Sequence, residues 1–165
     1  MCIFRRKKPV KPVPKVTEIF LSVPHEKYAR YNWCLPASAA MVFRYYGRNI
    51  TQAQIASKIT INSNASPFGL VSYAKELGYV AELKRKAIEE IEEYLRQDIP
   101  LIVNQFYSLA IKVEHSRVIT GFDSVKRELT MHDSAGESNY KISYKAFFAL
   151  GFSTSEVSHI IIIRR

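Results

Sequence analysis

Cys34 of this 165-residue chain directly precedes a segment with helical periodicity, a position that can make a thiol nucleophilic. Cys34 directly precedes Leu35, Pro36 and Ala37, and apolar residues then recur at three- and four-residue spacing up to Gly47. Proline suits the first turn of a helix and glycine the position after its last turn, so the sequence predicts a helix beginning at Cys34. The positive end of the helix dipole favours a thiolate over a thiol. Such a sulfur can attack a carbonyl carbon if a base takes its proton.

Four histidines are the candidates for that base, namely His25, His115, His132 and His159. His25 lies in a polar turn, which reaches the predicted helix only by folding over it. His132 alternates with its neighbours along a predicted strand, so it should point away from the acid that follows it. His159 opens the last predicted strand and has no acidic residue close behind it. These three are the weaker candidates.

His115 is the strongest candidate, because it stands at the start of a predicted strand and at the mouth of a loop. The next predicted strand ends at Asp133. If the two strands pair as a hairpin, the start of the first lies beside the end of the second, which brings His115 and Asp133 together. Cys34 would then be the nucleophile, His115 the general base and acid, and Asp133 the group that orients the imidazole.

Two alternatives remain open at this point. Asp123 competes with Asp133 for the third role, although it is more simply a turn residue after Gly121 and Phe122. A buried and chemically inert cysteine is the alternative to the triad as a whole.

The pattern around these residues predicts helices first and strands afterwards. Beyond the Cys34 helix, helices are predicted at residues 51–59, 68–77, 87–96 and 144–150. Strands are predicted at residues 16–23, 79–83, 101–103, 117–122, 128–133, 140–142 and 159–163, and a loop at residues 62–67. The segregation of helices from a predicted antiparallel sheet indicates an α+β fold rather than an alternating α/β fold.

The positive charge of the chain is concentrated at its N-terminus. The net charge is +9, and the first fifteen residues hold six of the 24 Lys and Arg and no acidic residue. We expect residues 1–15 to be a flexible, proline-rich tail and residues 16–165 to form a single domain. The alternative for the tail is an electrostatic contact with an anionic lipid, a nucleic acid or an acidic partner.

Other classes of protein are disfavoured by composition. No apolar run approaches the ~20 residues of a membrane span, and prolines interrupt the place where a signal peptide needs its apolar segment. A cytoplasmic protein is therefore expected. The two cysteines offer no disulfide framework, and no metal or cofactor is expected.

The segments around the three candidate residues resemble the C39 family of bacteriocin-leader-processing peptidases, and more closely their stand-alone C39-like relatives in the papain-like superfamily. The resemblance starts with residues 32–47, which are similar to the family's Cys-Gly-Pro-Ala helix ending in Tyr-Tyr-Gly. It continues through residues 99–103, 115–123 and 132–134, and covers about residues 20–165.

This resemblance implies a papain-like fold, in which an N-terminal helical part packs on a C-terminal antiparallel sheet. It also implies that Cys34, His115 and Asp133 form a catalytic triad. The implied activity is hydrolysis of a peptide bond in a peptide or protein substrate through a thioacyl intermediate on Cys34. Related leader peptidases often precede an ABC transporter, whereas a free-standing protein is expected here, in an oligomeric state that the sequence does not predict.

Two positions depart from the family's pattern. The Gln that usually stands six residues before the nucleophile, where it donates to the oxyanion hole, is Tyr28 here. The Gly that usually follows the nucleophile is Leu35, which we expect to narrow the approach to the sulfur. The Tyr28 hydroxyl or the Asn32 amide would have to replace the missing donor. A weakened or inactive peptide-binding domain and a papain-like acyl transferase therefore remain alternatives to a peptidase.

Overall fold

The computed structural model describes residues 16–152 and 156–165. The predicted tail, residues 1–15, lies outside the described residues. In chain order the elements are β1 (Glu18–Phe20), α1 (Cys34–Tyr45), α2 (Gln52–Ile59), β2 (Thr60–Ile61), β3 (Asn64–Ala65), α3 (Pro67–Glu76), β4 (Val80–Lys86), α4 (Ile88–Arg96), β5 (Leu101–Phe106), β6 (Glu114–Asp123), β7 (Glu128–Asp133), β8 (Tyr140–Ser143), α5 (Tyr144–Ala149) and β9 (Ser158–Arg164).

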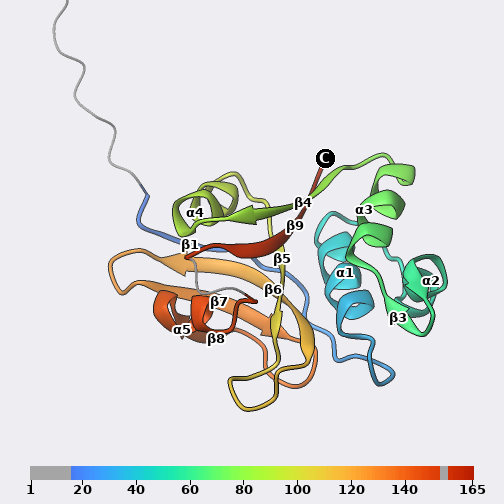
Figure 1. The fold of residues 1–165 in the computed structure, drawn as a ribbon. Helices are drawn as coiled ribbons and strands as arrows, with labels where there is room; N and C mark the ends of the chain where they lie inside the picture. The colour runs from blue at the N-terminus through green and yellow to red at the C-terminus, as the bar shows by residue number, and fades with distance from the viewer. Residues whose placement is uncertain (1–15, 153–155) are drawn as a thin grey trace, which may run out of the picture.

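A seven-stranded antiparallel sheet forms the centre of the molecule (Figure 1). Its order is β4-β9-β5-β6-β7-β8, so the last strand of the chain lies between β4 and β5. The seventh strand, β1, pairs with β6 beyond the end of β5, with Phe20 opposite Gly121. The pairing of β5 with β6 ends where Leu101 lies opposite Ile119. The long strand β6 therefore pairs with β5 over one part of its length and with β1 over the next.

The helices cover the sheet in two groups. In Figure 1, α1, α2 and α3 lie together on one side, while α4 and α5 lie on the other. Helix α1 packs against β6 and β5, and it is buried from Leu35 to Phe43. The structure therefore confirms the predicted α+β class, with an N-terminal helical part packed on an antiparallel sheet.

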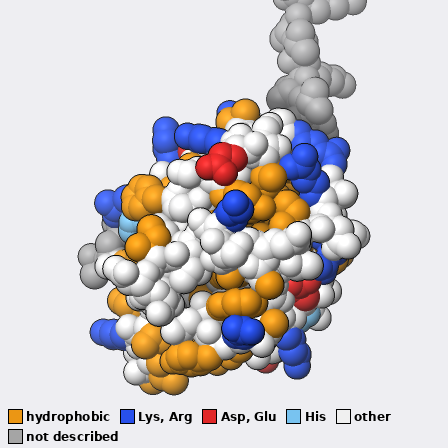
Figure 2. Space-filling view, turned by 90° about the vertical axis from the view of Figure 1, so that its right-hand side faces the viewer, with side chains coloured by type: hydrophobic (Ala, Val, Ile, Leu, Met, Phe, Trp, Pro, Cys, Tyr) orange, Lys and Arg blue, Asp and Glu red, His pale blue; other side chains and the backbone are white. Residues whose placement is uncertain are grey.

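The face of the molecule on the side of α2 and α3 carries apolar side chains in several separate groups, with Lys and Arg between them (Figure 2). Exposed apolar residues of the elements on this side include Ile61 and Phe68. Within the described residues, no helix is both long enough and apolar enough to span a membrane.

Local sequence signals account for most element boundaries. Thr51 and Gln54 form the predicted capping box at the start of α2, because each side chain accepts the other residue's backbone N–H. The predicted loop at residues 62–67 is wrong in part. Asn62 and Ser63 both have positive φ, 48° and 68°, and form a tight turn that closes the short β2–β3 hairpin. Ser66 then caps α3.

The first strand is shorter than predicted. Residues 16–23 were expected to be extended throughout, but strand pairing is limited to Glu18–Phe20. Leu21 still donates its backbone N–H to the Thr120 carbonyl at 2.7 Å, and the chain then leaves β6 towards the end of β7. This departure produces the segment of residues 21–29, which leads into α1.

Candidate active site

Cys34 is the first residue of α1, and its thiol is partly exposed. Trp33 occupies the N-cap position and makes no side-chain capping bond, so the first N–H groups of α1 are not capped by a side chain. The His115 imidazole and the backbone N–H groups of Ser116 and Leu35 lie close enough to the sulfur to favour its charged form. Burial alone would raise the pKa of the Cys34 thiol, but His115 and the two N–H groups lower it below its ordinary value.

The predicted β-hairpin brings His115 and Asp133 together. In the β6–β7 register, Asp133 lies opposite Arg117, and His115 lies two residues earlier on the same face of β6. The His115 Nε2 atom is 2.7 Å from Asp133 Oδ1, and the Ala135 N–H donates to the same oxygen at 2.8 Å. Since Nε2 bonds the carboxylate, Nδ1 is the ring nitrogen left for Cys34. The hairpin thus brings His115 and Asp133 into contact, as its register predicts, and the imidazole lies near the Cys34 thiol.

The pKa values of His115 and Asp133 are shifted in the directions that favour the charged form of each side chain. Burial of the His115 ring acts to lower its pKa, but the hydrogen bonds and charges of Asp133 and Cys34 raise it above the ordinary value. Burial acts to raise the pKa of Asp133, but the hydrogen bond and charge of His115, the Ala135 N–H and the charge of Arg117 bring it down to about 2. The interactions among Cys34, His115 and Asp133 thus favour the thiolate, the imidazolium and the carboxylate, which are the charged forms of the three side chains.

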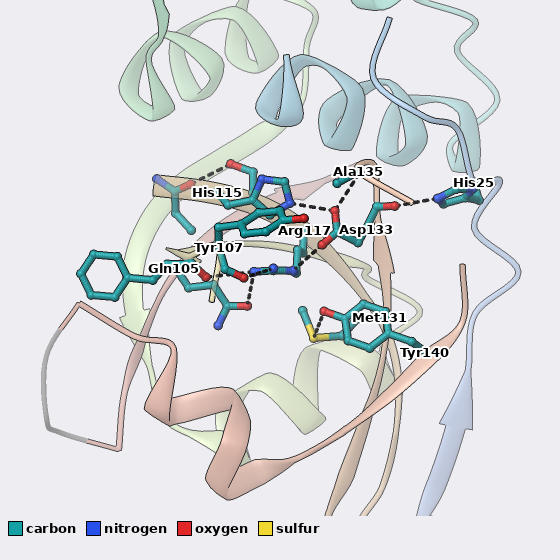
Figure 3. Close-up of polar contacts among 12 residues, drawn as sticks. His25, Gln105, Tyr107, His115, Arg117, Met131, Asp133, Ala135 and Tyr140 are labelled. Carbon is teal, nitrogen blue, oxygen red and sulfur yellow. Dashed lines mark hydrogen bonds and ion pairs between the residues drawn. The ribbon is translucent and has the colours of Figure 1, made fainter. Parts of the chain in front are cut away.

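Arg117 is a residue of this site that the sequence reasoning missed. Its Nε atom donates to Asp133 Oδ2 at 2.8 Å, and its side chain is 6% exposed. Figure 3 shows the Asp133 carboxylate held between His115 and Arg117. The signal was available, because a residue two positions after a candidate base shares its face, and hairpin pairing places it opposite the acid.

Tyr107 was also missed. Its ring packs edge-on against His115, with ring centroids 5.0 Å apart. A cavity of about 400 Å³ borders Tyr107, Arg117 and Asp133 on the side of Glu137 and Tyr140. A larger cavity of about 1000 Å³ lies between the start of α4 and α5, and none of the three predicted catalytic residues lines it.

The other histidines have structural partners. His25 reaches the site, but its Nε2 lies 2.9 Å from the backbone oxygen of Asp133 rather than from the carboxylate. His132 is buried, as expected on the opposite face of β7. Its Nε2 donates to the Val23 carbonyl at 2.8 Å, and its Nδ1 accepts the Asn139 N–H at 3.0 Å.

Two further candidates also have local roles. His159 packs its ring against Phe152, with centroids 5.6 Å apart. Asp123 accepts the backbone N–H groups of Val125 and Lys126, as the turn interpretation predicts. Among the described residues, no group of three or more His, Cys, Asp or Glu is arranged to hold a metal ion.

The structure alters the interpretation of both departures from the family pattern. Leu35 is 3% exposed and packs in the hydrophobic core, so the expectation that it narrows the approach to the sulfur is wrong. Tyr28 donates its backbone N–H to the Ser134 carbonyl at 3.0 Å, and the residue as a whole is 36% exposed. Gln52 cannot stand in for the missing Gln, because its amide donates to the Lys27 carbonyl at 2.7 Å and to Glu26.

Comparison with solved structures places this arrangement among known folds. A candidate C39-like peptidase from Bacillus anthracis superposes with a TM-score of 0.70 at 17% identity, over 90% of this chain and 98% of that one. The peptidase domain of Streptococcus ComA, a bi-functional ABC transporter involved in quorum sensing, gives 0.67 at 21% identity, over 84% and 96%. A double glycine motif protease from an AMS/PCAT transporter, in complex with the leader peptide, gives 0.67 at 18% identity, over 91% and 99%.

Sequence comparison gives a consistent result. No curated protein matches the chain significantly. The sequence model of the Peptidase_C39 like family, in contrast, matches residues 18–156, which include all the elements that carry Cys34, His115 and Asp133. The chain therefore belongs to the Peptidase_C39 like family.

Proposed function

We propose that this chain is a cysteine-type peptidase in which Cys34 is the nucleophile, His115 the general base and acid, and Asp133 the residue that orients His115. One observation carries this proposal. A thiol at a helix N-terminus lies beside an imidazole, and that imidazole is hydrogen-bonded to a carboxylate at 2.7 Å. The lowered pKa of the thiol and the raised pKa of the imidazole favour the ion pair that attacks most readily.

The reaction follows from these positions. The Cys34 sulfur attacks the carbonyl carbon of the scissile bond, and the carbonyl oxygen becomes an oxyanion. As the C–N bond breaks, the His115 imidazolium gives its proton to the leaving amine, which leaves a thioester on Cys34. Water then attacks the thioester while His115 takes its proton, and the thiol is restored when the acid product departs. Asp133 stabilises the charged imidazole throughout.

The oxyanion hole is the unusual part of this proposal. The Cys34 backbone N–H at the uncapped start of α1 supplies one donor, and the helix dipole favours negative charge there. The second donor, which the family draws from a Gln, falls to the Tyr28 hydroxyl or the Asn32 amide. Loss of one such donor costs on the order of 100- to 1000-fold in rate. We therefore propose a slow peptidase.

The proposed substrate is a peptide or a peptide segment of a protein. This assignment is supported by the similarity in fold to a double glycine motif protease in complex with its leader peptide. At 18% identity the similarity carries the fold alone, so a Gly-Gly cleavage site is not part of the proposal. Acyl transfer to an amine would use the same thioester, and it is distinguished by adding amines and weighing the products.

The test combines cleavage with thiol reactivity. A diverse peptide library is incubated with the protein and with Cys34→Ala and His115→Ala, and the cleaved peptides are identified by mass spectrometry. We expect cleavage by the unmodified protein alone. In parallel, iodoacetamide should label Cys34 quickly below pH 7, and His115→Ala should slow this labelling because the thiol keeps its burial but loses its proton acceptor and counter-charge.

A peptide-binding domain without catalysis is the second candidate, and Tyr28 in place of Gln is the observation that favours it. This candidate predicts that peptides bind equally well to the protein and to Cys34→Ala, with no cleavage by either. Labelling of Cys34 no faster than that of a free thiol across pH 5–8 would argue against the activated nucleophile itself.

A further inference from the structure

We propose that Arg117 is a positioning residue, which holds the Asp133 carboxylate and the Tyr107 ring in place around His115. This inference rests on the proposed function, because it concerns how the proposed triad keeps its geometry. Arg117 does not contact the reacting thiol in this arrangement. It acts on the imidazole through two neighbours, one charged and one aromatic.

A single guanidinium binds both neighbours. Arg117 Nε donates to Asp133 Oδ2 at 2.8 Å. Nη2 donates to the Tyr107 carbonyl at 2.6 Å, and Nη1 donates to the Phe106 carbonyl at 3.1 Å and to Gln105 Oε1 at 3.3 Å. Four of the five N–H groups of the guanidinium are thus engaged, by acceptors on β5, on the loop after it and on β7.

These bonds divide the two oxygens of the Asp133 carboxylate. Arg117 binds Oδ2, whereas His115 and the Ala135 N–H bind Oδ1. A carboxylate with only Oδ1 engaged can rotate about its bond to the chain, and the imidazole then loses a fixed partner. Binding at both oxygens fixes the plane of the carboxylate, and with it the direction of the bond to His115.

The same guanidinium fixes the aromatic side of the imidazole. Its bonds to the Phe106 and Tyr107 carbonyls hold the backbone at the point where β5 ends. Tyr107 carries the ring that packs edge-on against His115. His115 therefore lies between two groups that share one anchor, as Figure 3 shows.

A lysine cannot replace this anchor. An ammonium group retains the charge, but it lacks the planar fork that reaches a carboxylate and two carbonyls at fixed angles. Arg117 is 5% exposed, so water has little room to replace the missing donors. The other titratable groups that line the adjoining cavity are Glu137 and Tyr140. Burial is the main reason that the pKa of Tyr140 is raised to about 12, so the Tyr140 hydroxyl stays neutral.

The experiment measures the rate of Cys34 alkylation by iodoacetamide from pH 4 to 9, which needs no substrate. The variants are Arg117→Lys, Arg117→Gln and Asp133→Asn. Arg96→Gln is the matched control, because Arg96 forms a similar ion pair with Glu92 at 2.7 Å with both side chains largely buried. This pair lies on α4, on the opposite side of the molecule from α1 (Figure 1). Urea unfolding of each variant shows the stability lost.

We expect both Arg117 variants to move the apparent pKa of the thiol upward, in the same direction as Asp133→Asn. A shift of one unit slows alkylation about tenfold at a pH below the pKa. Arg96→Gln should lose stability without moving the pH profile. A purely structural role for Arg117 would give the Arg96→Gln result, because the folded molecules that remain would react as before.

Each other outcome is decisive. A normal profile for Arg117→Lys with a shifted one for Arg117→Gln assigns the effect to charge alone and overturns the positioning role. Normal profiles for both, with a shifted one for Asp133→Asn, overturn this inference and leave the triad intact. A normal profile for Asp133→Asn contradicts the role of Asp133 in the proposed function, and the inference falls with it. The alkylation rate is measured for the folded molecules alone, so a variant that is partly unfolded still gives a pH profile.

Discussion

Opposing influences act on the thiol of Cys34. Its partial burial disfavours the charged form, whereas the imidazole of His115 and two backbone N–H groups favour it, and the second influence prevails. Most of the groups that lower the pKa of the thiol lie outside the helix, because Ser116 and His115 belong to β6. The helix N-terminus is therefore only one contribution to the reactivity of this sulfur, and the neighbouring strand supplies the larger part of the polar contacts.

Tyr28 offers the sharpest prediction at this scale. Restoring the usual donor with Tyr28→Gln should raise kcat by about tenfold or more and leave KM nearly unchanged, because an oxyanion donor acts in the transition state. The measurement is steady-state cleavage of the best peptide from the library. Tyr31→Gln is the control, since Tyr31 is an 83% exposed tyrosine that lies in the same stretch of chain.

A fall in kcat for Tyr28→Gln would contradict this expectation. It would show that the tyrosine hydroxyl already acts as the donor, as one of the two proposed replacements requires. An unchanged kcat would place the second donor elsewhere, with the Asn32 amide as the next group to replace.

At the scale of elements, the contact between β1 and β6 depends on one glycine. A Cβ atom added at Gly121 would lie 2.4 Å from the Ile19 carbonyl oxygen, which belongs to the backbone of β1. Backbone cannot rotate away as a side chain can, so β1 would have to move off the edge of β6. The segment of residues 21–29 continues directly from this strand to the start of α1.

We predict that Gly121→Ala lowers the free energy of unfolding by about 1–3 kcal/mol, the usual cost of overpacking. Urea unfolding measures the loss. Gly136→Ala is the matched control, because a Cβ there meets nothing within 4 Å, and its effect should stay within about 0.5 kcal/mol. Equal losses for the two variants would show that the close approach of β1 contributes nothing.

The sequence predicts the local features of these elements well. The helix start at Cys34, the capping box at Thr51 and the β6–β7 hairpin each depend on residues close in the chain, whose spacing is visible in the sequence. The hairpin alone was enough to bring His115 and Asp133 together. Boundaries were less reliable, as the short β1 and the unforeseen β2–β3 hairpin show.

Features that depend on distant residues were not predictable. Nothing local in the sequence places β9 between β4 and β5, or β1 beside β6. Leu35 was expected near the sulfur because the sequence shows only that it follows Cys34, whereas the helix turns its side chain into the core. The four bonds of Arg117 join residues 105–107 to residue 133, and a strand pattern does not show such a connection.

At the scale of the whole molecule, the site affects stability as well as reactivity. The folded pKa of Asp133 is about 2, below the ordinary value of 3.8. The unfolded chain therefore binds more protons than the folded chain between these values. The stabilising contribution is complete above pH 5 and is lost as the pH falls towards 2, and it amounts to about 2 kcal/mol.

We predict a shallower acid dependence of stability for Asp133→Asn than for the unmodified protein. The free energy of unfolding, measured in urea between pH 5 and 2.5, should converge for the two proteins as the pH falls. Asp98→Asn, which changes an exposed carboxylate that is not part of the site, is the control variant. Parallel curves for Asp133→Asn would contradict the lowered pKa.

The segment of residues 21–29 has a consequence for the order of events during synthesis. Its bonds from His132 to Val23 and from His25 to Asp133 span 109 and 108 residues, and Cys34 itself depends on His115. The ribosome adds about 5–20 residues per second, so His115, which comes 81 residues later in the chain, follows Cys34 by roughly 4–16 s. During this interval the emerging thiol has no imidazole partner. In a nascent chain with this topology, the thiol of Cys34 is therefore not activated until β6 has been made and has paired in the sheet.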